Sequence, residues 1–208
     1  KITASNITLD AKDKTFNLSG TRVLRAANGS SVHIKNCTLA ISSEEALYLE
    51  SSESSFILED CILELSSSCS IDTGSIEIRG NVVVTGDSYS FILGGNGHTI
   101  ASDSCLIVDS GVSLCLTPAN ATDNFLNFTD DTSFLVLKGA TLNIDENFKS
   151  KFSSNNIILE RDCNINTVRY GGSYNPITAD TSGEVEFANA NIDIKEDLNI
   201  ANMSMRLK

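Results

Sequence analysis

Residues 32–41 read Val32-x-Ile34-x-x-Cys37-x-Leu39-x-Ile41, and residues 56–65 read Phe56-x-Leu58-x-x-Cys61-x-Leu63-x-Leu65. Every position shifts by the same amount, 56 − 32 = 24. Each copy holds two short runs in which apolar residues alternate with other residues, and this period of two is typical of β-strands that bury one face. A two-residue step and a small side chain separate the runs, as a corner of the chain requires.

The same spacing returns along the rest of the chain. The further copies are Ile76-x-Ile78-x-x-Asn81-x-Val83-x-Thr85 (a weaker one), Leu135-x-Leu137-x-x-Ala140-x-Leu142-x-Ile144, Val185-x-Phe187-x-x-Ala190-x-Ile192-x-Ile194 and Leu198-x-Ile200-x-x-Met203-x-Met205-x-Leu207. Repeats of about 20–25 residues indicate a solenoid, because one unit cannot bury its apolar face alone.

The pattern predicts an all-β, parallel β-helix with three short strands per coil. Leu47 and Leu126 each stand nine residues before a copy (56 − 47 and 135 − 126), which places a third strand upstream of each pair. At roughly 22 residues per coil, the chain makes about nine coils. The side chains expected to point inward are Val32, Phe56, Leu135 and Val185 on one sheet, and Leu39, Leu63, Leu142 and Ile192 on the next. An antiparallel β-sandwich is the alternative, but it does not explain a small corner residue at a constant offset.

One domain over residues 1–208 accommodates all copies. Residues 169–184 contain Gly171-Gly172 and Asn175-Pro176 and form the longest stretch without alternation, so we interpret them as an excursion loop from one coil. Because the first residue is Lys1, we expect that the numbering starts after processing or inside a longer polypeptide.

These repeats resemble the parallel β-helix proteins, the group that holds pectate lyases, phage tailspikes and autotransporter passenger domains. The resemblance runs from about Ile7 to Leu207. The phrase Gly95-Asn96-Gly97-His98-Thr99-Ile100 is also similar to turn-plus-strand text common in bacterial surface β-helices. The resemblance implies an architecture rather than an activity, because this fold hosts enzymes, adhesins and inert stalks.

Composition narrows the choice of partners. The net charge is −12 and the pI about 4.5, which argues against nucleic acid, because neutralising phosphates needs a basic stripe. The same acidity argues against a basic membrane-binding patch, and no apolar run has the length that spans a bilayer. An acidic surface suits a secreted or surface-exposed protein.

The acidic residues do not form a catalytic cluster in the sequence. A polysaccharide lyase or hydrolase needs carboxylates grouped on one face, whereas here they come as separate pairs, which we interpret as solvated turn charge. Arg22, Arg25 and Lys35 are candidates to line a surface with Glu59. The acidic pairs are Glu44-Glu45, Glu59-Asp60, Asp130-Asp131, Asp145-Glu146 and Glu196-Asp197.

No cofactor or metal is predicted. Gly94-Gly95-Asn96-Gly97 begins like the nonapeptide of calcium β-rolls, but Thr99 stands where the liganding Asp belongs and the motif occurs once. We interpret it as a glycine-rich turn. His33 and His98 have no partner at metal-ligand spacing, and none of the six cysteines forms a Cys-x-x-Cys pair.

Cys37 and Cys61 occupy the same position in successive copies. Stacked strands lie about 4.8 Å apart, inside the Cα separation that a disulfide tolerates, so a bridge is one interpretation. The other is a ladder of buried thiols that act as small apolar side chains. Ala140 and Ala190 fill the same position in later copies, and this favours thiols.

Apolar, strand-patterned sequence reaches both ends of the chain, without a polar or helical cap. An open sheet edge invites strand addition, so we expect a longer solenoid or head-to-tail stacking of copies. The function predicted is a non-catalytic extracellular or cell-surface structural or adhesive module, with a host or surface glycan as a further partner. A carbohydrate-active β-helix enzyme or glycan-binding module is the alternative. The candidate assembly edges are Ile2, Ile7, Leu9, Met203, Met205 and Leu207.

Overall fold

The computed structural model describes residues 6–95, 97–118, 125–144, 157–160 and 163–165 with their side chains, and elsewhere only the backbone of further β-strands. Strands and turns make up all of these residues. None of them forms a helix long and apolar enough to cross a membrane.

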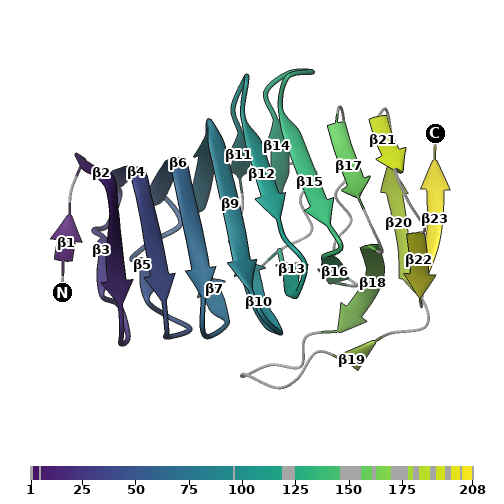
Figure 1. The fold of residues 1–208 in the computed structure, drawn as a ribbon, viewed down its shortest axis with the longest axis horizontal. Coiled ribbons are helices and arrows are strands. Elements are labelled where there is room, and N and C mark those ends of the chain that lie inside the picture. Colours follow the sequence, from purple (N-terminus) through teal and green to yellow (C-terminus); the bar gives the residue numbers. More distant parts are fainter. Residues whose placement is uncertain are drawn as a thin grey trace.

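The chain winds into a parallel β-solenoid with three faces (Figure 1). Each of the three long strands bends and lies on the first and second faces. The third face is split into two sheets. Long strands: β2 (Ile7–Leu18), β4 (Ser31–Ile41) and β6 (Ser55–Leu65). First face: β8 (Ser75–Arg79), β11 (His98–Ile100) and β14 (Leu126–Phe128). Second face: β9 (Asn81–Gly86), β12 (Cys105–Val108), β15 (Phe134–Lys138), β17 (Asn156–Glu160) and β21 (Asn191–Ile194).

The third face begins with β1 (Ile2–Ala4), β3 (Leu24–Ala26) and β5 (Leu47–Leu49) in one sheet. Its second sheet contains β7 (Cys69–Ile71), β10 (Tyr89–Leu93), β13 (Val112–Leu116), β16 (Thr141–Asp145), β18 (Cys163–Arg169) and β22 (Leu198–Ala201). The ladders between all these strands are parallel. Parallel stacking of coils excludes the antiparallel β-sandwich and confirms the predicted fold class.

The corner in the repeat is a residue with left-handed backbone conformation. In β4 this residue is Asn36 (φ 53°), and in β6 it is Asp60 (φ 51°). Asn and Asp adopt this conformation at lower cost than other residues with a Cβ. In the next coil Gly80 (φ 57°) takes the corner, and the strand divides there into β8 and β9.

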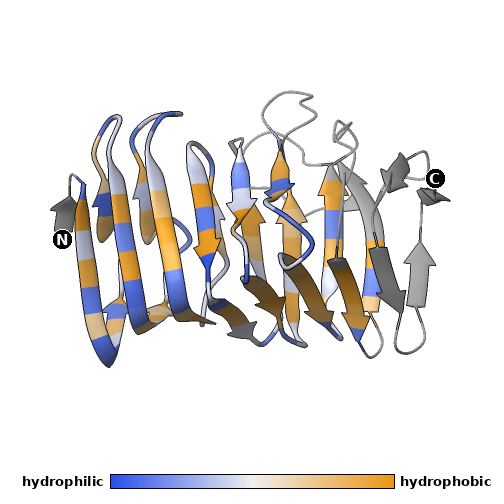
Figure 2. Ribbon diagram, turned by 90° about the horizontal axis from the view of Figure 1, so that it is seen from above, coloured by the Kyte–Doolittle hydropathy of each residue, from blue (hydrophilic) through white to orange (hydrophobic). Residues whose placement is uncertain are grey.

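The core runs through the solenoid as stacked rows of aliphatic side chains. Val32, Phe56, Leu39 and Leu63 are fully buried, as the alternation predicts. Figure 2 shows the same alternation as bands of hydrophobic and hydrophilic residues along the long strands. Leu135 and Leu142 are also buried, whereas the side chains of Val185 and Ile192 lie outside the described residues.

The later copies of the repeat lie on different faces from the earlier ones. Leu135 pairs with Leu106 on the second face, whereas Phe56 pairs with Val32 on the first. Leu142 pairs with Leu114 on the third face, so the prediction that it shares a sheet with Leu63 is wrong. The ten-residue pattern records two strands and a corner, and each coil contains more than one such corner.

The weaker copy also has a different parity. Glu59 pairs with Arg79, but Ile62 pairs with Val83, so the corner holds one residue more than in β6 (83 − 79 against 62 − 59). The extra residue turns Val83 outward and buries Val82 and Val84. The inward orientation that the pattern predicted for Val83 is therefore wrong.

The solenoid has about six turns, not nine. Six coil-to-coil steps join one core row from β2 to β17, and their lengths vary from 21 residues (84 − 63) to 29 residues (137 − 108). Division of the chain by a fixed short coil therefore overestimates the count. The row is Phe16, Leu39, Leu63, Val84, Val108, Leu137 and Leu159.

The predicted excursion at 169–184 is described only in part. Within it, β19 (Thr178–Ala179) pairs antiparallel with β18, unlike the coil ladders. The strand β20 (Gly183–Phe187) begins at its end and pairs in parallel with β23 (Met203–Leu207). The other residues of the excursion lie outside the described part of the chain.

Candidate functional site

The third face is interrupted between β5 and β7, and the interruption forms a small hollow. β5 pairs with β3 and β7 pairs with β10, but the two sheets are not joined in one ladder. One backbone hydrogen bond still crosses the interruption, from the Ser70 N–H to the Glu44 carbonyl at 2.9 Å. We call this place the β5–β7 break. Its lining residues are Glu45, Leu47, Tyr48, Leu49, Ser70, Ile71, Asp72 and Thr73.

An aromatic ring and two arginines lie beside the break. The Arg22 guanidinium carbon is 4.0 Å from the Tyr48 ring centroid, and that of Arg25 is 5.9 Å away. Arg22 Nε donates to Glu45 Oε2 at 3.1 Å, and Arg25 forms an ion pair with Glu50. Cation–π contacts of this kind contribute about 0.5–1 kcal/mol each at exposed sites. They also occupy a ring that would otherwise be free to stack on a sugar.

Carboxyl groups approach the break from both sides. Partial burial, helped by the charges of Asp72 and Glu45, raises the pKa of the Glu44 carboxyl. The Ser70 hydroxyl donates a short hydrogen bond to Asp72. A carboxyl with a raised pKa beside a second carboxylate is the kind of pair that glycosidases use. The hollow of about 20 Å³, however, has room for little more than one water molecule.

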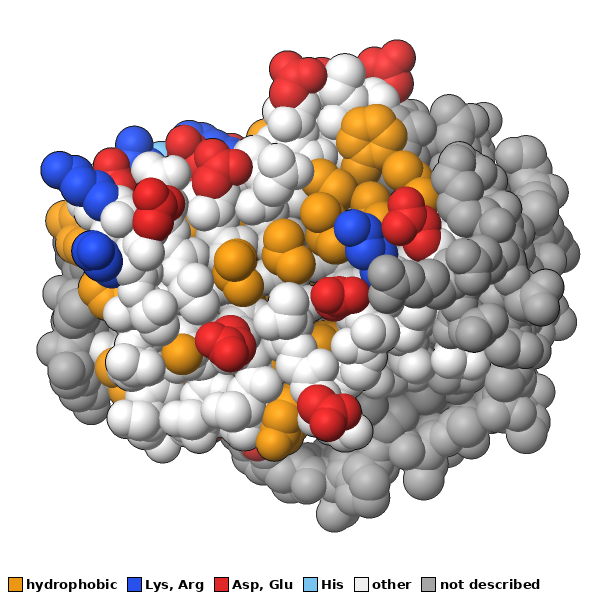
Figure 3. Space-filling view, viewed as in Figure 1, with side chains coloured by type: hydrophobic (Ala, Val, Ile, Leu, Met, Phe, Trp, Pro, Cys, Tyr) orange, Lys and Arg blue, Asp and Glu red, His pale blue; other side chains and the backbone are white. Residues whose placement is uncertain are grey.

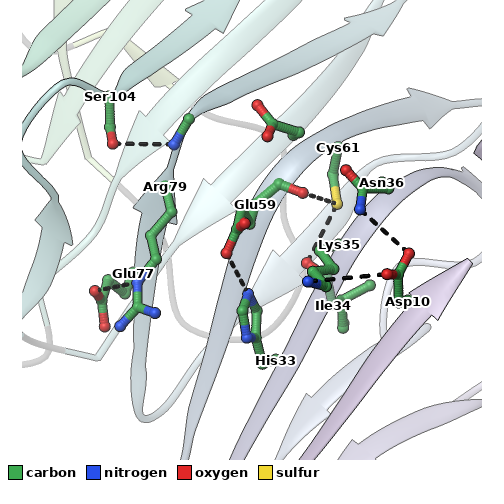
Figure 4. A network of polar contacts seen from close by, with 12 residues as sticks. Asp10, His33, Ile34, Lys35, Asn36, Glu59, Cys61, Glu77, Arg79 and Ser104 are labelled. Atoms are coloured by element: carbon green, nitrogen blue, oxygen red, sulfur yellow. Dashed lines mark hydrogen bonds and ion pairs between the residues drawn. The ribbon is translucent and has the colours of Figure 1, made fainter. Parts of the chain in front are cut away.

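The first face carries a ladder of alternating charge on its outer side. Asp10, Lys35, Glu59 and Arg79 pair in register on four successive coils. Lys35 Nζ lies 3.8 Å from Asp10 Oδ2, and His33 Nε2 lies 2.7 Å from Glu59 Oε2 (Figure 4). Exposed ion pairs contribute about 0–1 kcal/mol each, so this ladder favours the correct register of the coils more than it adds stability.

This arrangement corrects one expectation about the basic residues. Lys35 does share a face with Glu59, but Arg22 and Arg25 lie with Tyr48 near the third face. The acidic pairs also separate. Glu59 contacts His33, while Asp60 Oδ1 accepts a hydrogen bond from the Asn81 N–H at 2.9 Å.

Two further acidic pairs cannot be placed as side chains, because Asp145-Glu146 and Glu196-Asp197 lie outside the residues whose side chains are described. Asp130 accepts hydrogen bonds from Ser102 and Thr132, and these contacts lower the pKa of its carboxyl. No group of three or more His, Cys, Asp or Glu residues that is able to hold a metal ion occurs within the described part of the chain.

The second face presents a row of β-branched aliphatic side chains to the outside. This aliphatic ladder consists of Ile62, Val83, Ile107, Val136 and Ile158, which pair in register on five successive coils. Ile62 is 44% exposed, whereas Val136 is almost fully covered by its neighbours. Figure 3 shows hydrophobic side chains gathered across this side of the molecule. The ladder was missed from the sequence because the parity of β9 changes at its corner.

Cys37 and Cys61 are partners in the β4–β6 ladder, and their Sγ atoms lie 3.6 Å apart. Both side chains are buried, and all six cysteines are free thiols. The Cys61 thiol also contacts the carbonyl oxygens of Ile34 at 3.4 Å and Glu59 at 3.2 Å. Ala140 is likewise fully buried at its corner, so the position accepts small apolar groups.

The predicted assembly edges are described at one end of the solenoid only. Ile7 is 38% exposed in β2, and Leu9 is partly buried against the core. Ile2 lies in β1, and Met203, Met205 and Leu207 lie in β23, but their side chains are outside the described set. The structure therefore does not bring the two groups of edge residues together within one described surface.

No protein-family model, curated protein or solved structure matches this chain. The resemblance to pectate lyases, tailspikes and autotransporter passengers therefore stays at the level of architecture. The fold is established by the ladders and the buried rows of this chain alone.

Proposed function

We propose that this chain is a non-catalytic structural or adhesive module of the cell surface or extracellular space that associates end to end. The support comes from the continuity of the core, which passes from coil to coil without an interruption on the first and second faces from β2 to β9. Stacked coils of this kind form a stiff body whose flanks carry little chemistry.

The observation that carries the proposal is the exposure of the first coil. Ile7 occupies the same inward row as Val32 and Phe56, which are fully buried, yet Ile7 is 38% exposed. Among the strands that the structure describes, β2 pairs with β4 alone. Another coil laid against β2 would continue the ladder and cover Ile7, which favours strand addition at this edge.

The contact partner that we propose is the opposite end of a second copy. Such a contact joins two different surfaces, and it propagates into a filament when no rotation closes the ring. The competing occupant is a preceding segment of a longer polypeptide, which would cover the same edge within one molecule.

The cysteines support an oxidising location. Burial raises the pKa of the Cys69 thiol to about 12 and that of Cys105 to about 11. The thiolate is the reactive species, so a raised pKa slows oxidation. A protein with these thiols remains reduced at such positions even outside the cell.

Light scattering and electron microscopy of the purified chain over a concentration series test the proposal. We expect particles that lengthen with concentration, and we expect Ile7→Lys to abolish them. Ile62→Lys is the matched control, because it places the same charge on the flank of the solenoid. Monomers at all concentrations would refute end-to-end association, and loss of particles with Ile62→Lys alone would assign the contact to the flank.

A glycan-binding module is the second candidate, and the β5–β7 break is the observation that favours it. Tyr48, Ser70 and Asp72 offer a ring, a hydroxyl and a carboxylate within one hollow. The test is binding to a glycan panel by the chain and by Tyr48→Ala. Release of reducing or unsaturated ends that Glu44→Gln abolishes would instead show a carbohydrate-active enzyme, an outcome that our proposal does not expect.

A further inference from the structure

We propose that Cys37 and Cys61 are a redox-convertible pair that joins two successive coils by a disulfide when the chain folds in the presence of a small disulfide oxidant. The pair is distinctive among the described cysteines, because its members are ladder partners of each other. Cys69 pairs with Phe91, Cys105 pairs with Asn81 and Phe134, and Cys115 pairs with Ile92 and Asn143.

The geometry needs only a small adjustment. Neighbouring strands stand about 4.8 Å apart, and disulfides span Cα separations of about 4.4–6.8 Å. The two Sγ atoms already lie 3.6 Å apart, in van der Waals contact. Each cysteine directly follows a left-handed corner residue, Asn36 or Asp60. Side-chain rotation at the corner closes the remaining gap without a change of register.

The chemistry is thiol–disulfide exchange with oxidised glutathione as the oxidant. The Cys61 thiolate attacks one sulfur of glutathione disulfide, forms a mixed disulfide and releases one glutathione thiolate. The Cys37 thiolate then attacks Sγ of Cys61, forms the Cys37–Cys61 bond and releases the second glutathione. Two protein thiols are oxidised and one glutathione disulfide is reduced to two thiols, so electrons and protons balance.

Burial decides when this exchange happens. The exposed fraction is 4% for Cys37 and 1% for Cys61, so the closed solenoid excludes a tripeptide disulfide from both sulfurs. Contact with Cys61 and burial also raise the pKa of the Cys37 thiol. The exchange therefore occurs while β4 and β6 are assembling, and the folded protein then preserves whichever redox state it acquired.

The test is refolding of the full chain from denaturant with a glutathione redox buffer, followed by alkylation and cleavage after Lys, Arg and Glu. These cleavages separate Cys37 in peptide 36–44, Cys61 in peptide 60–64 and Cys69 in peptide 65–77. We expect peptides 36–44 and 60–64 to be joined, with a mass two hydrogen atoms below their sum. The folded, reduced protein should form this species far more slowly under the same buffer.

Cys69→Ala is the matched control and should leave the joined peptides unchanged, whereas Cys37→Ala or Cys61→Ala should abolish them. Because alanine occupies the corner at position 140, these variants are expected to fold. If they do not, wild-type protein in its reduced and oxidised forms gives the answer, since the oxidised form should unfold at higher denaturant concentration. Alkylation of both thiols after oxidative refolding, or a joint to Cys69 instead, would overturn the proposal. Equal rates for folded and refolding protein would overturn the timing.

Discussion

His98 is expected to make the solenoid sensitive to acid. Its side chain is 1% exposed, and it lies edge-on to Phe125 with ring centroids 4.9 Å apart. Nδ1 accepts a hydrogen bond from the Ile76 N–H at 3.1 Å, and Nε2 donates to the Gly94 carbonyl at 2.7 Å. The ring therefore occupies a neutral tautomer that a proton on Nδ1 would disrupt, because two donors would then face each other.

The magnitude follows from the pKa. Burial lowers the pKa of His98 from 6.5 to about 4, although the hydrogen bond to Gly94 partly opposes this. The unfolded chain thus binds the proton more tightly than the folded chain. Stability is unaffected above pH 6.5, falls as the pH drops from 6.5 to about 4, and levels off below. A difference of 2.5 pKa units (6.5 − 4) corresponds to about 3 kcal/mol.

Urea unfolding between pH 4 and pH 8, extrapolated linearly to water, measures this loss. His98→Gln removes the titrating group and keeps a donor for Gly94, so the variant should start about 1–3 kcal/mol less stable at neutral pH, because the Ile76 N–H loses its acceptor. Its stability should then change less with pH than that of the wild type. His33→Gln is the control, because it retains His98 and should retain the loss.

The result that would refute this reasoning is a pH dependence shared by wild type and His98→Gln. That outcome would assign the acid sensitivity to carboxyl groups. A flat profile for the wild type between pH 6.5 and pH 4.5 would also contradict the burial of a neutral imidazole.

Three further predictions concern packing and thiol chemistry. Phe56→Ala should cost about 3–5 kcal/mol in the free energy of unfolding, because Phe56 is fully buried in the first face; Ile62→Ala should change it by less than about 1 kcal/mol, since Ile62 points outward, and equal losses in urea titrations would contradict the assigned parity. Gly95→Ala should cost more than about 1 kcal/mol by the same measurement, because Gly95 has φ +73° and an added Cβ would meet the Gly74 carbonyl oxygen at 2.3 Å; wild-type stability would show that the turn relaxes freely. Cys69 should react with a thiol reagent only after unfolding, because burial raises its pKa to about 12; rapid labelling of the native protein, read by mass spectrometry, would disprove its burial.

The two strong copies at 32–41 and 56–65 were predictable in detail. Inward and outward positions alternate along a strand whatever its neighbours are, so Val32 and Phe56 could be assigned to the core from the sequence. The small corner side chain also identified Cys37 and Cys61 as equivalent. Their separation of 24 residues specified that the coils stack in parallel.

Only the tertiary structure decided which face each later copy occupies. The Leu135 copy looks like the Phe56 copy because all corners between buried strands need the same alternation and the same small residue. One extra residue at Gly80 and Asn81 reverses the parity of β9, and the sequence carries no signal that counts it.

The candidate sites depend on the same long-range register. Tyr48 and Asp72 meet at the β5–β7 break because the third face loses its ladder there, and His98 meets Ile76 because β11 stacks on β8. The sequence by itself determined the strand, its buried side and the parallel stacking, since these follow from local alternation and a repeat length. Coil length, face and contacts between coils were decided by the tertiary structure, because they depend on how each turn adds or omits residues between one strand and the next.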